Sequence, residues 1–239
     1  MAGRKFLVLL GIAALVLAGL ALPLFRRHQH SAAVRAWGSY TIKDRMDEFA
    51  AARGRVQDHL RRAGLTFPPA RVVLLGLKDE RRLEVYAGAA DGSLRFVASH
   101  PILAASGGPG PKLREGDRQV PEGVYPLESL NPNSRFHVAL RVGYPSAFDR
   151  RMAQRDGRSQ LGGDIMIHGG AASVGCLAMG DPAAEDLFVL AAAAGIDNVT
   201  IVLAPVDLRS RPLPQGLDAG WRAEVYAAVR AQLDRLPDP

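Results

Sequence analysis

The stretch Asp164-Ile-Met-Ile-His-Gly-Gly-Ala-Ala-Ser-Val-Gly-Cys-Leu-Ala-Met179 contains the single cysteine of the chain, Cys176, downstream of a histidine, His168. The apolar run Ile165–Ile167 predicts a short buried strand that ends at His168, and Gly169-Gly170 predicts a loop that returns toward the cysteine. A thiol attacks a carbonyl carbon as its thiolate, and a neighbouring imidazole can take the proton. The pair therefore indicates acyl transfer through a thioester.

Gly175 precedes the cysteine and lacks a Cβ, so the backbone can turn sharply there. The consecutive N–H groups of Val174, Gly175 and Cys176 would then point to one place, which predicts an oxyanion hole. Taken singly, a lone cysteine is more often a small buried hydrophobe, and a lone histidine is more often structural or solvated. The joint order of strand, His-Gly and Ser-x-Gly-Cys favours a catalytic site over these alternatives.

These residues resemble the signature of the L,D-transpeptidase (YkuD-type) family, which runs His-Gly, a short loop, Ser-His-Gly-Cys, an apolar residue and Arg or Asn. The matching positions here are His168-Gly169, Ser173, Gly175 and Cys176. Two positions depart from the signature, because Val174 stands where the family usually has a second histidine and Ala178 where it usually has Arg or Asn. The departures leave the acyl acceptor more open than the nucleophile.

Two upstream segments add to the resemblance and point to the YafK-like branch of the family. They are Gly116-Asp117-Arg118-Gln119-Val120-Pro121-Glu122-Gly123, and Asn131-Pro132-Asn133-Ser134 through Gly143-Tyr144-Pro145. The resemblance spans about residues 70 to 205 and implies a mainly β (α+β) fold. Its expected form is a β-sandwich or barrel-like sheet, with a helix after the catalytic cysteine and flanking N- and C-terminal helices.

The resemblance also implies a substrate and a set of roles. Cys176 would be the nucleophile, and His168 would take its proton or pair with the thiolate as an imidazolium. Ser173 would order the loop or orient His168, and Gly169 would let the substrate approach. The donor would be a peptidoglycan stem peptide, attacked after the L-centre of its diamino acid with release of D-alanine. The acceptor would be the amine of another diamino acid or a wall-linked protein.

In the family the region around residue 117 lines the substrate cleft, so Asp117, Arg118 and Glu122 are candidate substrate-binding residues. Ordinary turn chemistry is the open alternative for these three. His137 falls on a predicted strand, opposite the apolar face, and is interpreted as solvated or structural. An arginine between residues 144 and 163 would be able to hold a carboxylate of the stem peptide.

Three other functions stay open at this point. One is a hydrolase, an L,D-endopeptidase or amidase that cuts such bonds, in which water resolves the thioester. Another is a non-catalytic cell-wall-binding module, although binding alone needs no thiol. The last is an anchored β-rich domain whose cysteine is buried. Replacement of Cys176 by alanine separates the first two, because binding should survive it and thioester formation should not.

Length and composition bound the remaining classes. The chain has 239 residues, of which 48% are hydrophobic, and a formal net charge of +6. This is enough for one globular domain with appended segments, whose basic surface suits an anionic polymer such as cell wall. Nucleic acid is not expected, because the arginines are scattered. No cofactor motif or metal-ligand spacing is present, and one cysteine excludes an intrachain disulfide.

The N-terminal residues predict export. Arg4 and Lys5 precede the uncharged run Phe6–Phe25, and Arg26 and Arg27 follow it. A run of about 20 apolar residues can cross a bilayer. Residues 1–30 are therefore expected to be a signal peptide or, slightly favoured, a retained inner-membrane anchor, with the remainder on the periplasmic side of a bacterial envelope. A helical spacer (31–69), the catalytic domain (70–205) and a C-terminal helical extension (206–239) would follow.

Hydrophobic periodicity places the other elements. An amphipathic helix is predicted from Tyr40 to Gly64. Asp181 is expected as the N-cap, and Pro182 as the first residue, of a helix that Gly195 ends. Strands are predicted at residues 71–78, 82–87, 94–98, 135–142 and 198–204, a loop at 106–111, a surface loop with a short helix or a flap at 144–163, and a helix at 221–236.

Overall fold

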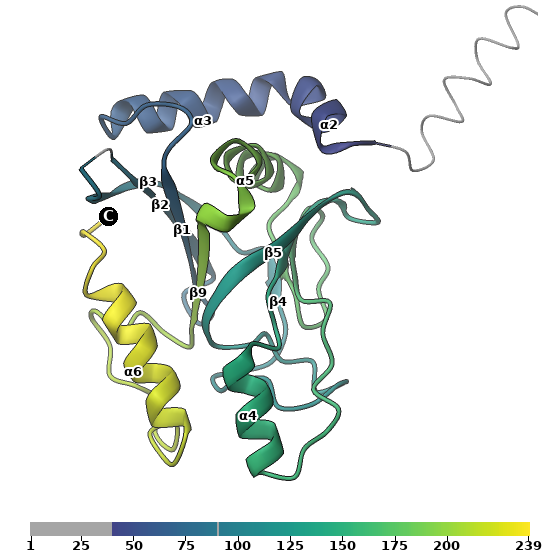
Figure 1. Cartoon of the computed structure of the whole chain (residues 1–239), viewed down its shortest axis with the longest axis vertical. Helices are drawn as coiled ribbons and strands as arrows, with labels where there is room; N and C mark the ends of the chain where they lie inside the picture. The colour runs from purple at the N-terminus through teal and green to yellow at the C-terminus, as the bar shows by residue number, and fades with distance from the viewer. Residues whose placement is uncertain (1–39, 90) are drawn as a thin grey trace, which may run out of the picture. The chain divides into compact units, whose positions relative to one another are not determined.

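The apolar runs that follow the N-terminal helices form one curled sheet. The computed structural model describes residues 40–89 and 91–239, and within them nine strands follow the order β3-β2-β1-β9-β5-β6-β7-β8-β4 (Figure 1). Their bounds are Arg71–Leu77 (β1), Arg82–Gly88 (β2), Leu94–Pro101 (β3), Ala104–Ala105 (β4), Gly123–Ser134 (β5), His137–Val142 (β6), Met166–His168 (β7), Leu177–Ala178 (β8) and Val199–Ala204 (β9). The predicted mainly β (α+β) fold is confirmed.

The sheet curls until its two ends meet. β3 and β4 are the first and last strands of the order, yet only Ile102-Leu103 separates them in the chain. The interior is correspondingly tight: a Cβ at Gly76 of β1 would lie 2.7 Å from Leu203 Cδ2 and 3.5 Å from Leu177 Cδ1 of β8. Strands far apart in the order therefore face each other across one core, which gives the barrel-like form.

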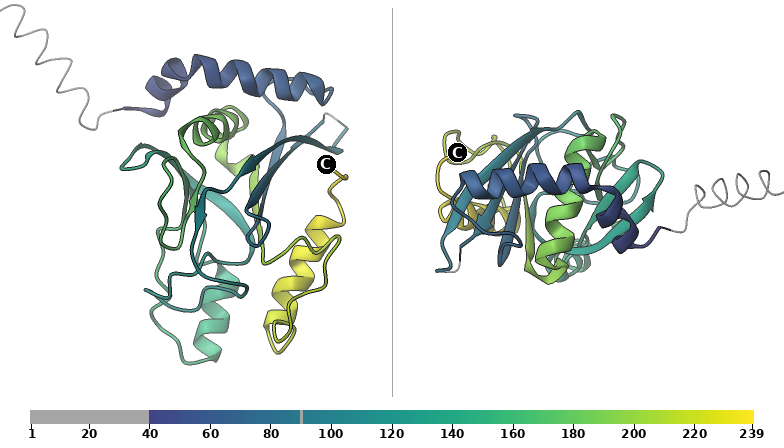
Figure 2. Two further views of the ribbon diagram at one scale, coloured as in Figure 1. Left: turned by 180° about the vertical axis from the view of Figure 1, so that it is seen from behind. Right: turned by 90° about the horizontal axis from the view of Figure 1, so that it is seen from above.

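Helices cover the sheet on both sides. Their bounds are Ile42–Glu48 (α2), Ala50–Arg62 (α3), Ala147–Arg155 (α4), Asp181–Ala194 (α5) and Arg222–Leu233 (α6). The main core lies between the concave face of the sheet and α5, with α3 laid across α5 (Figure 2). A second apolar cluster lies on the opposite face of β1, β2 and β9, under α6 and the C-terminal residues.

The helix predicted from Tyr40 to Gly64 is divided in two at Phe49. Thr41 and Asp44 form a capping box that starts α2, and Phe49 (φ −88°, ψ 40°) ends it. Its ring is buried and packs edge-on against Phe188 of α5, with ring centroids 6.2 Å apart. The bend brings this aromatic ring into the core, a tertiary contact that helical periodicity does not reveal. Gly54 lies within α3 without breaking it.

The prediction that Asp181 caps α5 is wrong. Gly180 is the N-cap, and Asp181 is already inside the helix. The carboxylate of Asp181 instead accepts a hydrogen bond from Gly170 N, 2.8 Å away in the loop after β7. The expected stop at Gly195 is confirmed, and its φ of 85° suits a residue without a Cβ. The predicted short helix between residues 144 and 163 is α4.

The expected signal peptide or anchor at residues 1–30 lies outside the described residues. Within residues 40–89 and 91–239 no helix is long and apolar enough to cross a membrane. Residues 41–239 form one compact unit in which α2, α3 and α6 pack with the sheet. The division into a spacer, a catalytic domain and an extension stays a prediction about function.

Candidate active site

The register of β7 and β8 places His168 and Cys176 on the same face of the sheet. The two strands are parallel, with Ile167 opposite Leu177 and His168 opposite Ala178. Ile167 and Leu177 point into the main core. Side chains alternate along a strand, so Met166 and His168 lie on the other face. The same register puts Cys176 opposite Met166. Cys176 therefore also lies on that face, diagonally adjacent to His168.

His168 is held by its backbone neighbour and by an aromatic ring. Its Nδ1 lies 2.6 Å from Gly169 O, and the ring stacks on Phe136 with centroids 4.6 Å apart and planes at 28°. A carbonyl oxygen only accepts, so Nδ1 carries the proton and Nε2 of the neutral ring keeps its lone pair. Burial lowers the pKa of His168, and the hydrogen bond to Gly169 O opposes this in part. The imidazole is therefore neutral at pH 7, as a general base must be.

Cys176 rests as a thiol rather than a thiolate. Burial raises the pKa of Cys176, and the hydrogen bond from Met166 N, 3.4 Å from Sγ, offsets this only in part. The thiol also donates to the backbone oxygen of Asp164 at 3.5 Å. In this structure the hydrogen bonds of Sγ therefore go to backbone groups and not to His168. Of the two predicted forms of the pair, the neutral one fits this environment.

Hydroxyl groups order the loop before Cys176. Ser173 Oγ donates to Cys176 O at 2.6 Å and accepts from Cys176 N at 3.0 Å. Gly175 N donates to Ser106 Oγ at 2.6 Å, and Gly175 has the φ of 86° that favours glycine. Two of the N–H groups expected in the oxyanion hole are thus bonded to hydroxyls here. The oxyanion-hole role stays a prediction, and it requires Gly175 N and Cys176 N to break their hydrogen bonds to these hydroxyls.

Gly169 is buried against protein atoms rather than open to a ligand. A Cβ there would lie 2.5 Å from Asp181 Oδ1 and 2.7 Å from Phe136 O. Its N–H donates to Val138 O at 3.2 Å. The glycine lets the loop after His168 pack against β6 and α5, and its predicted role in substrate approach stays a prediction.

Asp117 and Arg118, two of the predicted substrate-binding residues, lie in a turn that Ser106 links to the loop before Cys176, and their role in substrate binding stays a prediction. Asp117 accepts from Lys112 Nζ at 2.6 Å and from the backbone N–H groups of Leu113, Arg114 and Gln119, so its carboxylate holds its own turn. Arg118 is exposed, with a φ of 56°, and its backbone oxygen accepts from Ser106 Oγ at 2.7 Å. Ordinary turn chemistry accounts for these contacts of Asp117 and Arg118.

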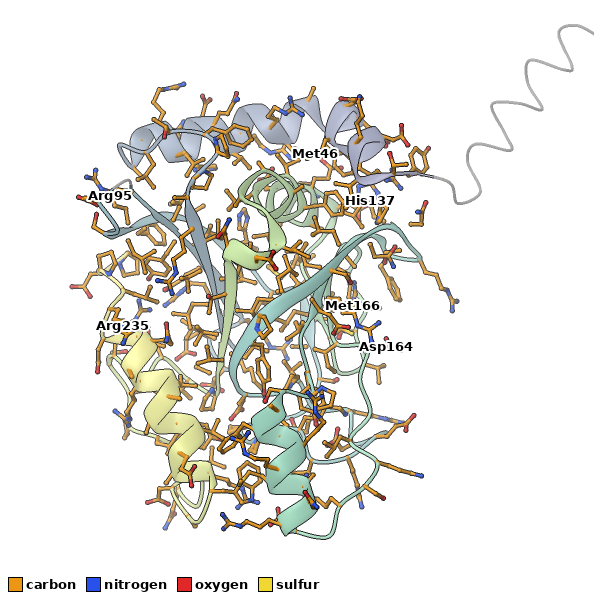
Figure 3. All side chains as sticks on the ribbon, viewed as in Figure 1. Met46, Arg95, His137, Asp164, Met166 and Arg235 are labelled. Carbon is orange, nitrogen blue, oxygen red and sulfur yellow. The ribbon has the colours of Figure 1, made fainter. Side chains whose placement is uncertain are left out.

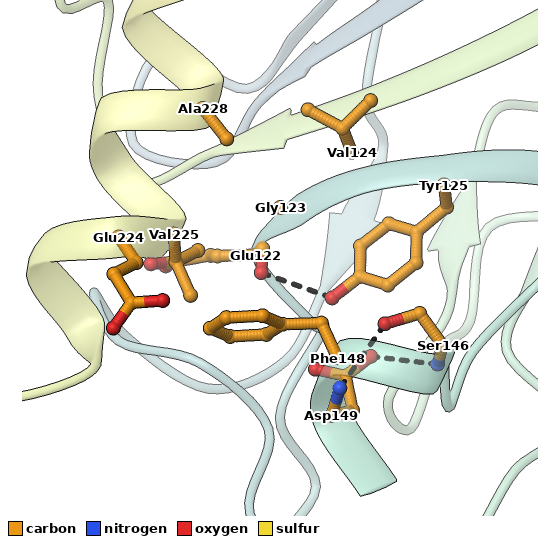
Figure 4. A pocket seen from close by; sticks show the side chains of 10 residues that line it. All are labelled: Glu122, Gly123, Val124, Tyr125, Ser146, Phe148, Asp149, Glu224, Val225 and Ala228. Atoms are coloured by element: carbon orange, nitrogen blue, oxygen red, sulfur yellow. Dashed lines mark hydrogen bonds between the residues drawn. The ribbon is translucent and has the colours of Figure 1, made fainter. Parts of the chain in front are cut away.

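Glu122 belongs to a buried cluster with Lys78 and Tyr226. It lies 2.8 Å from Lys78 Nζ and accepts from Tyr226 Oη of α6 at 2.6 Å. It also lines a pocket between β5, α4 and α6, which neither Cys176 nor His168 lines (Figure 4). The contacts of Glu122 thus join the C-terminal helix to the sheet. Its predicted role in substrate binding stays a prediction.

Several residues near the thiol were missed by reasoning from sequence. Phe136 covers His168, Ser106 bonds to Gly175, and Arg141 on β6 pairs with Asp164, 2.8 Å away. In Figure 3, Met166 is the first residue of β7, Asp164 lies two residues before it, and His137 is the first residue of β6. Only Phe136 had a sequence signal, as it follows the Asn-Pro-Asn-Ser segment. Among the described residues no His, Cys, Asp and Glu cluster is suited to a metal ion.

A buried histidine on the same sheet face as a thiol is an arrangement that cysteine acyltransferases and hydrolases use. The sequence is similar to that of "Putative L,D-transpeptidase YafK" from Escherichia coli K12, with 36% identity over 113 residues. The predicted resemblance to the L,D-transpeptidase family is thereby confirmed. The match covers 46% of this chain and 43% of that protein, so the chain spans less than half of the relative's length.

Two solved structures are similar to this chain over part of their length. The helical cell shape determining protein Pgp2 from Campylobacter jejuni is 23% identical, with a TM-score of 0.45 over 64% of this chain and 56% of that one. L,D-transpeptidase 1 of Mycobacterium tuberculosis is 15% identical, with a TM-score of 0.33 over 56% of this chain and 62% of that one. No family model matches the sequence.

Proposed function

We propose that this chain is a peptidoglycan L,D-transpeptidase that acts through a thioester on Cys176. The observation that carries the proposal is the pair on one sheet face: a partly buried thiol diagonal to a neutral imidazole whose Nδ1–H is fixed by Gly169 O. That arrangement leaves the Nε2 lone pair as the base. The similarity to a protein named as an L,D-transpeptidase supports the choice of a stem peptide as the donor.

The proposed reaction begins from the neutral pair. The thiol proton passes to His168 Nε2 as Sγ bonds to the carbonyl carbon of the diamino acid, so no stable thiolate has to form in the buried site. The imidazolium then gives that proton to the nitrogen of the departing D-alanine as the peptide C–N bond breaks. An acceptor amine then attacks the thioester and gives one proton to His168 Nε2, the C–S bond breaks, and His168 returns that proton to the sulfur.

The tetrahedral intermediate carries a negative oxygen that needs donors. Gly175 N and Cys176 N are the nearest backbone groups, and each would have to leave its serine hydroxyl to serve. Loss of one oxyanion donor typically raises the barrier by about 2.7–4 kcal/mol. The proposal therefore includes a step in which a backbone N–H group stops donating to a serine hydroxyl and donates to the oxyanion instead.

The proposed substrate places the reaction on the periplasmic side of the envelope. Residues 1–30 would export or anchor the chain, and the partners would be stem peptides and, for wall anchoring, a protein amine. The net charge of +6 favours approach to an anionic polymer.

Mass spectrometry of products and of the intact protein tests the proposal. The full chain, purified in detergent, is incubated with disaccharide-tetrapeptide and with crosslinked murein fragments, beside a Cys176→Ala control. A crosslinked dimer or release of D-alanine that needs Cys176 supports the transpeptidase. Fragments that only shorten would favour the hydrolase. No turnover and no acyl adduct with either substrate would reject both and leave a binding or structural domain.

A further inference from the structure

Arg141 lies in the same row of the sheet as the proposed nucleophile. β6 and β7 are antiparallel with Arg141 opposite Met166, and Cys176 is level with Met166 on the far side of β7. Val138, Leu140 and Val142 of β6 point into the main core. Alternation along the strand therefore puts Arg141 on the face that carries Cys176 and His168.

The guanidinium of Arg141 is only partly used within the protein. Nη1 lies 2.8 Å from Asp164 Oδ1, but the Asp164 side chain is 78% exposed. Nε is buried without a hydrogen-bond partner, although Glu128 Oε2 lies 3.3 Å away. Ion pairs to exposed carboxylates contribute little in water. The planar fork of an arginine matches a carboxylate with two parallel hydrogen bonds, and that capacity is unfilled here.

A surface groove opens beside this side chain. It is lined by Pro126, Glu128, Arg141, Gly143, Arg150 and Gly163, among others. The two arginines face one carboxylate in it, so the groove suits an anionic group. Gly163, which lines the groove, precedes Asp164, and the backbone oxygen of Asp164 accepts the thiol hydrogen bond of Cys176, so the groove begins near the proposed nucleophile.

We propose that Arg141 is a specificity-determining residue that binds a carboxylate of the donor stem peptide by displacing Asp164. The proposal rests on the proposed function, because that function supplies a peptide donor rich in carboxylates. Asp164 holds the guanidinium in place until the donor arrives, and the incoming carboxylate takes Nη1 from Asp164 and bonds to Nη2 as well, along the end-on edge of the guanidinium. The scissile carbonyl is thereby fixed near Sγ.

Binding measurements in the full chain carrying Cys176→Ala test this assignment without turnover. Titration calorimetry with disaccharide-tetrapeptide compares this parent with versions that add Arg141→Ala, Arg141→Lys or Asp164→Asn. Loss of a charge-assisted paired contact should weaken binding by about tenfold or more for Arg141→Ala, and by less for Arg141→Lys. Asp164→Asn removes the competitor, suits the left-handed backbone at that position, and should strengthen binding.

Donors with one carboxyl group converted to an amide identify the group that is bound. The three candidates are the terminal D-alanine, the glutamate and the diamino acid. A donor with the amide at the bound position should bind the parent more weakly, by the same factor that Arg141→Ala loses with the unmodified donor. The Arg141→Ala variant should bind this amide and the unmodified donor equally. Thermal melting shows that each variant is folded.

The possible outcomes separate this proposal from the proposed function. Unchanged binding by Arg141→Ala, additive effects of all three amides, or no binding by the parent would overturn the carboxylate role. Equal weakening by Arg141→Ala and Asp164→Asn would also overturn it, since Arg141 would then act only by ordering the loop. The variants could show the expected binding differences while the wild-type chain neither transfers nor hydrolyses the donor. That result would reject the proposed function alone.

Discussion

The two halves of the sheet are covered differently, and the proposed chemistry lies on the half with an uncovered face. Strands β1, β2 and β9 have apolar cores on both faces, α3 and α5 on one side and α6 on the other. Their residues are accordingly almost all buried, as in Arg71–Leu77, where only the first residue is exposed. Strands β6, β7 and β8 face the main core on one side only. Their other face carries Arg141, His168 and Cys176.

A half that is covered twice can only contribute stability, because its side chains contact other side chains in every direction. The half that is covered once, strands β6, β7 and β8, is called the open half below. It keeps a face on which polar groups can be partly buried and still be reached by a substrate. Burial there is enough to keep both His168 and Cys176 neutral, by lowering the pKa of the first and raising the pKa of the second. The comparison predicts that substitutions on the two halves affect different measurements.

The largest expected effect is that of His168→Gln on the open half. Removal of the proposed general base should lower the rate of acyl-enzyme formation by about 10²–10⁴-fold, because the imidazole is the proposed acceptor of the thiol proton. The rate is followed by intact-protein mass spectrometry with the tetrapeptide donor. His59→Gln, on α3 under the other side of the core, is the matched control and should acylate at the wild-type rate. Equal rates for wild type and His168→Gln would show that the imidazole is not the base.

On the doubly covered half, Leu75→Ala should affect stability and leave the chemistry of the folded protein alone. Leu75 is a residue of β1 and is fully buried in the apolar cluster under α6. Its truncation should therefore lower the free energy of unfolding by about 2–5 kcal/mol. Leu103→Ala makes the same change at a side chain that is 50% exposed, and should stay within about 0.5 kcal/mol of wild type. Urea denaturation measures both. A similar loss at the two sites would contradict the burial of Leu75 under α6.

The doubly covered half was also the easier one to predict from sequence. Continuous apolar runs bounded by turn signals gave β1, β2 and β9 nearly to the residue, because the hydrophobic pattern and the local turns agree there. The open half depends on pairings between distant segments. β8 is only Leu177–Ala178, and no periodicity identifies so short a strand. Its register with β7 is nevertheless what brings Cys176 level with Met166.

Site residues divide in the same way. His168 and Cys176 could be found because their residue types and local glycines carry a recognisable chemistry. Ser106, Arg141 and Asp164 could not, since their roles arise from contacts across the sheet. Asp117 and Glu122 illustrate the opposite case: their carboxylates are taken up by Lys112 and Lys78, partners that sequence spacing does not assign.

Acid should lower the stability of the protein through two histidines, His168, which is buried, and His100, which is half-buried. Burial lowers the pKa of both His168 and His100 below the ordinary value of 6.5, so the unfolded chain binds more protons than the folded one as the pH falls through 6.5. Stability is therefore complete above that pH, declines below it by at most about 1.4 kcal/mol per pH unit for each histidine, and levels off below the folded-state pKa.

Urea denaturation between pH 8 and pH 5 measures this slope. The variant His168→Gln should show a smaller slope than wild type, because only the contribution of His100 remains. Acylation by the wild type should likewise persist below pH 6.5, since the imidazole stays neutral there. An unchanged slope in the variant, or an acid limb of acylation above pH 6.5, would contradict the buried neutral imidazole.

The smallest expected effect concerns Ser106, which joins the loop at residues 106–111 to the loop of the nucleophile. Its hydroxyl accepts from Gly175 N and donates to Arg118 O. Ser106→Ala should lower the free energy of unfolding by about 1 kcal/mol, because hydrogen bonds are lost. If Gly175 N serves the oxyanion, the same change frees it, and acyl-enzyme formation should speed up severalfold while stability falls. Ser173→Ala gives the contrasting case, since Ser173 bonds both backbone groups of Cys176 and its loss should slow acylation. Slower acylation in Ser106→Ala as well would mean that Ser106 shapes the loop and does not compete for the oxyanion donor.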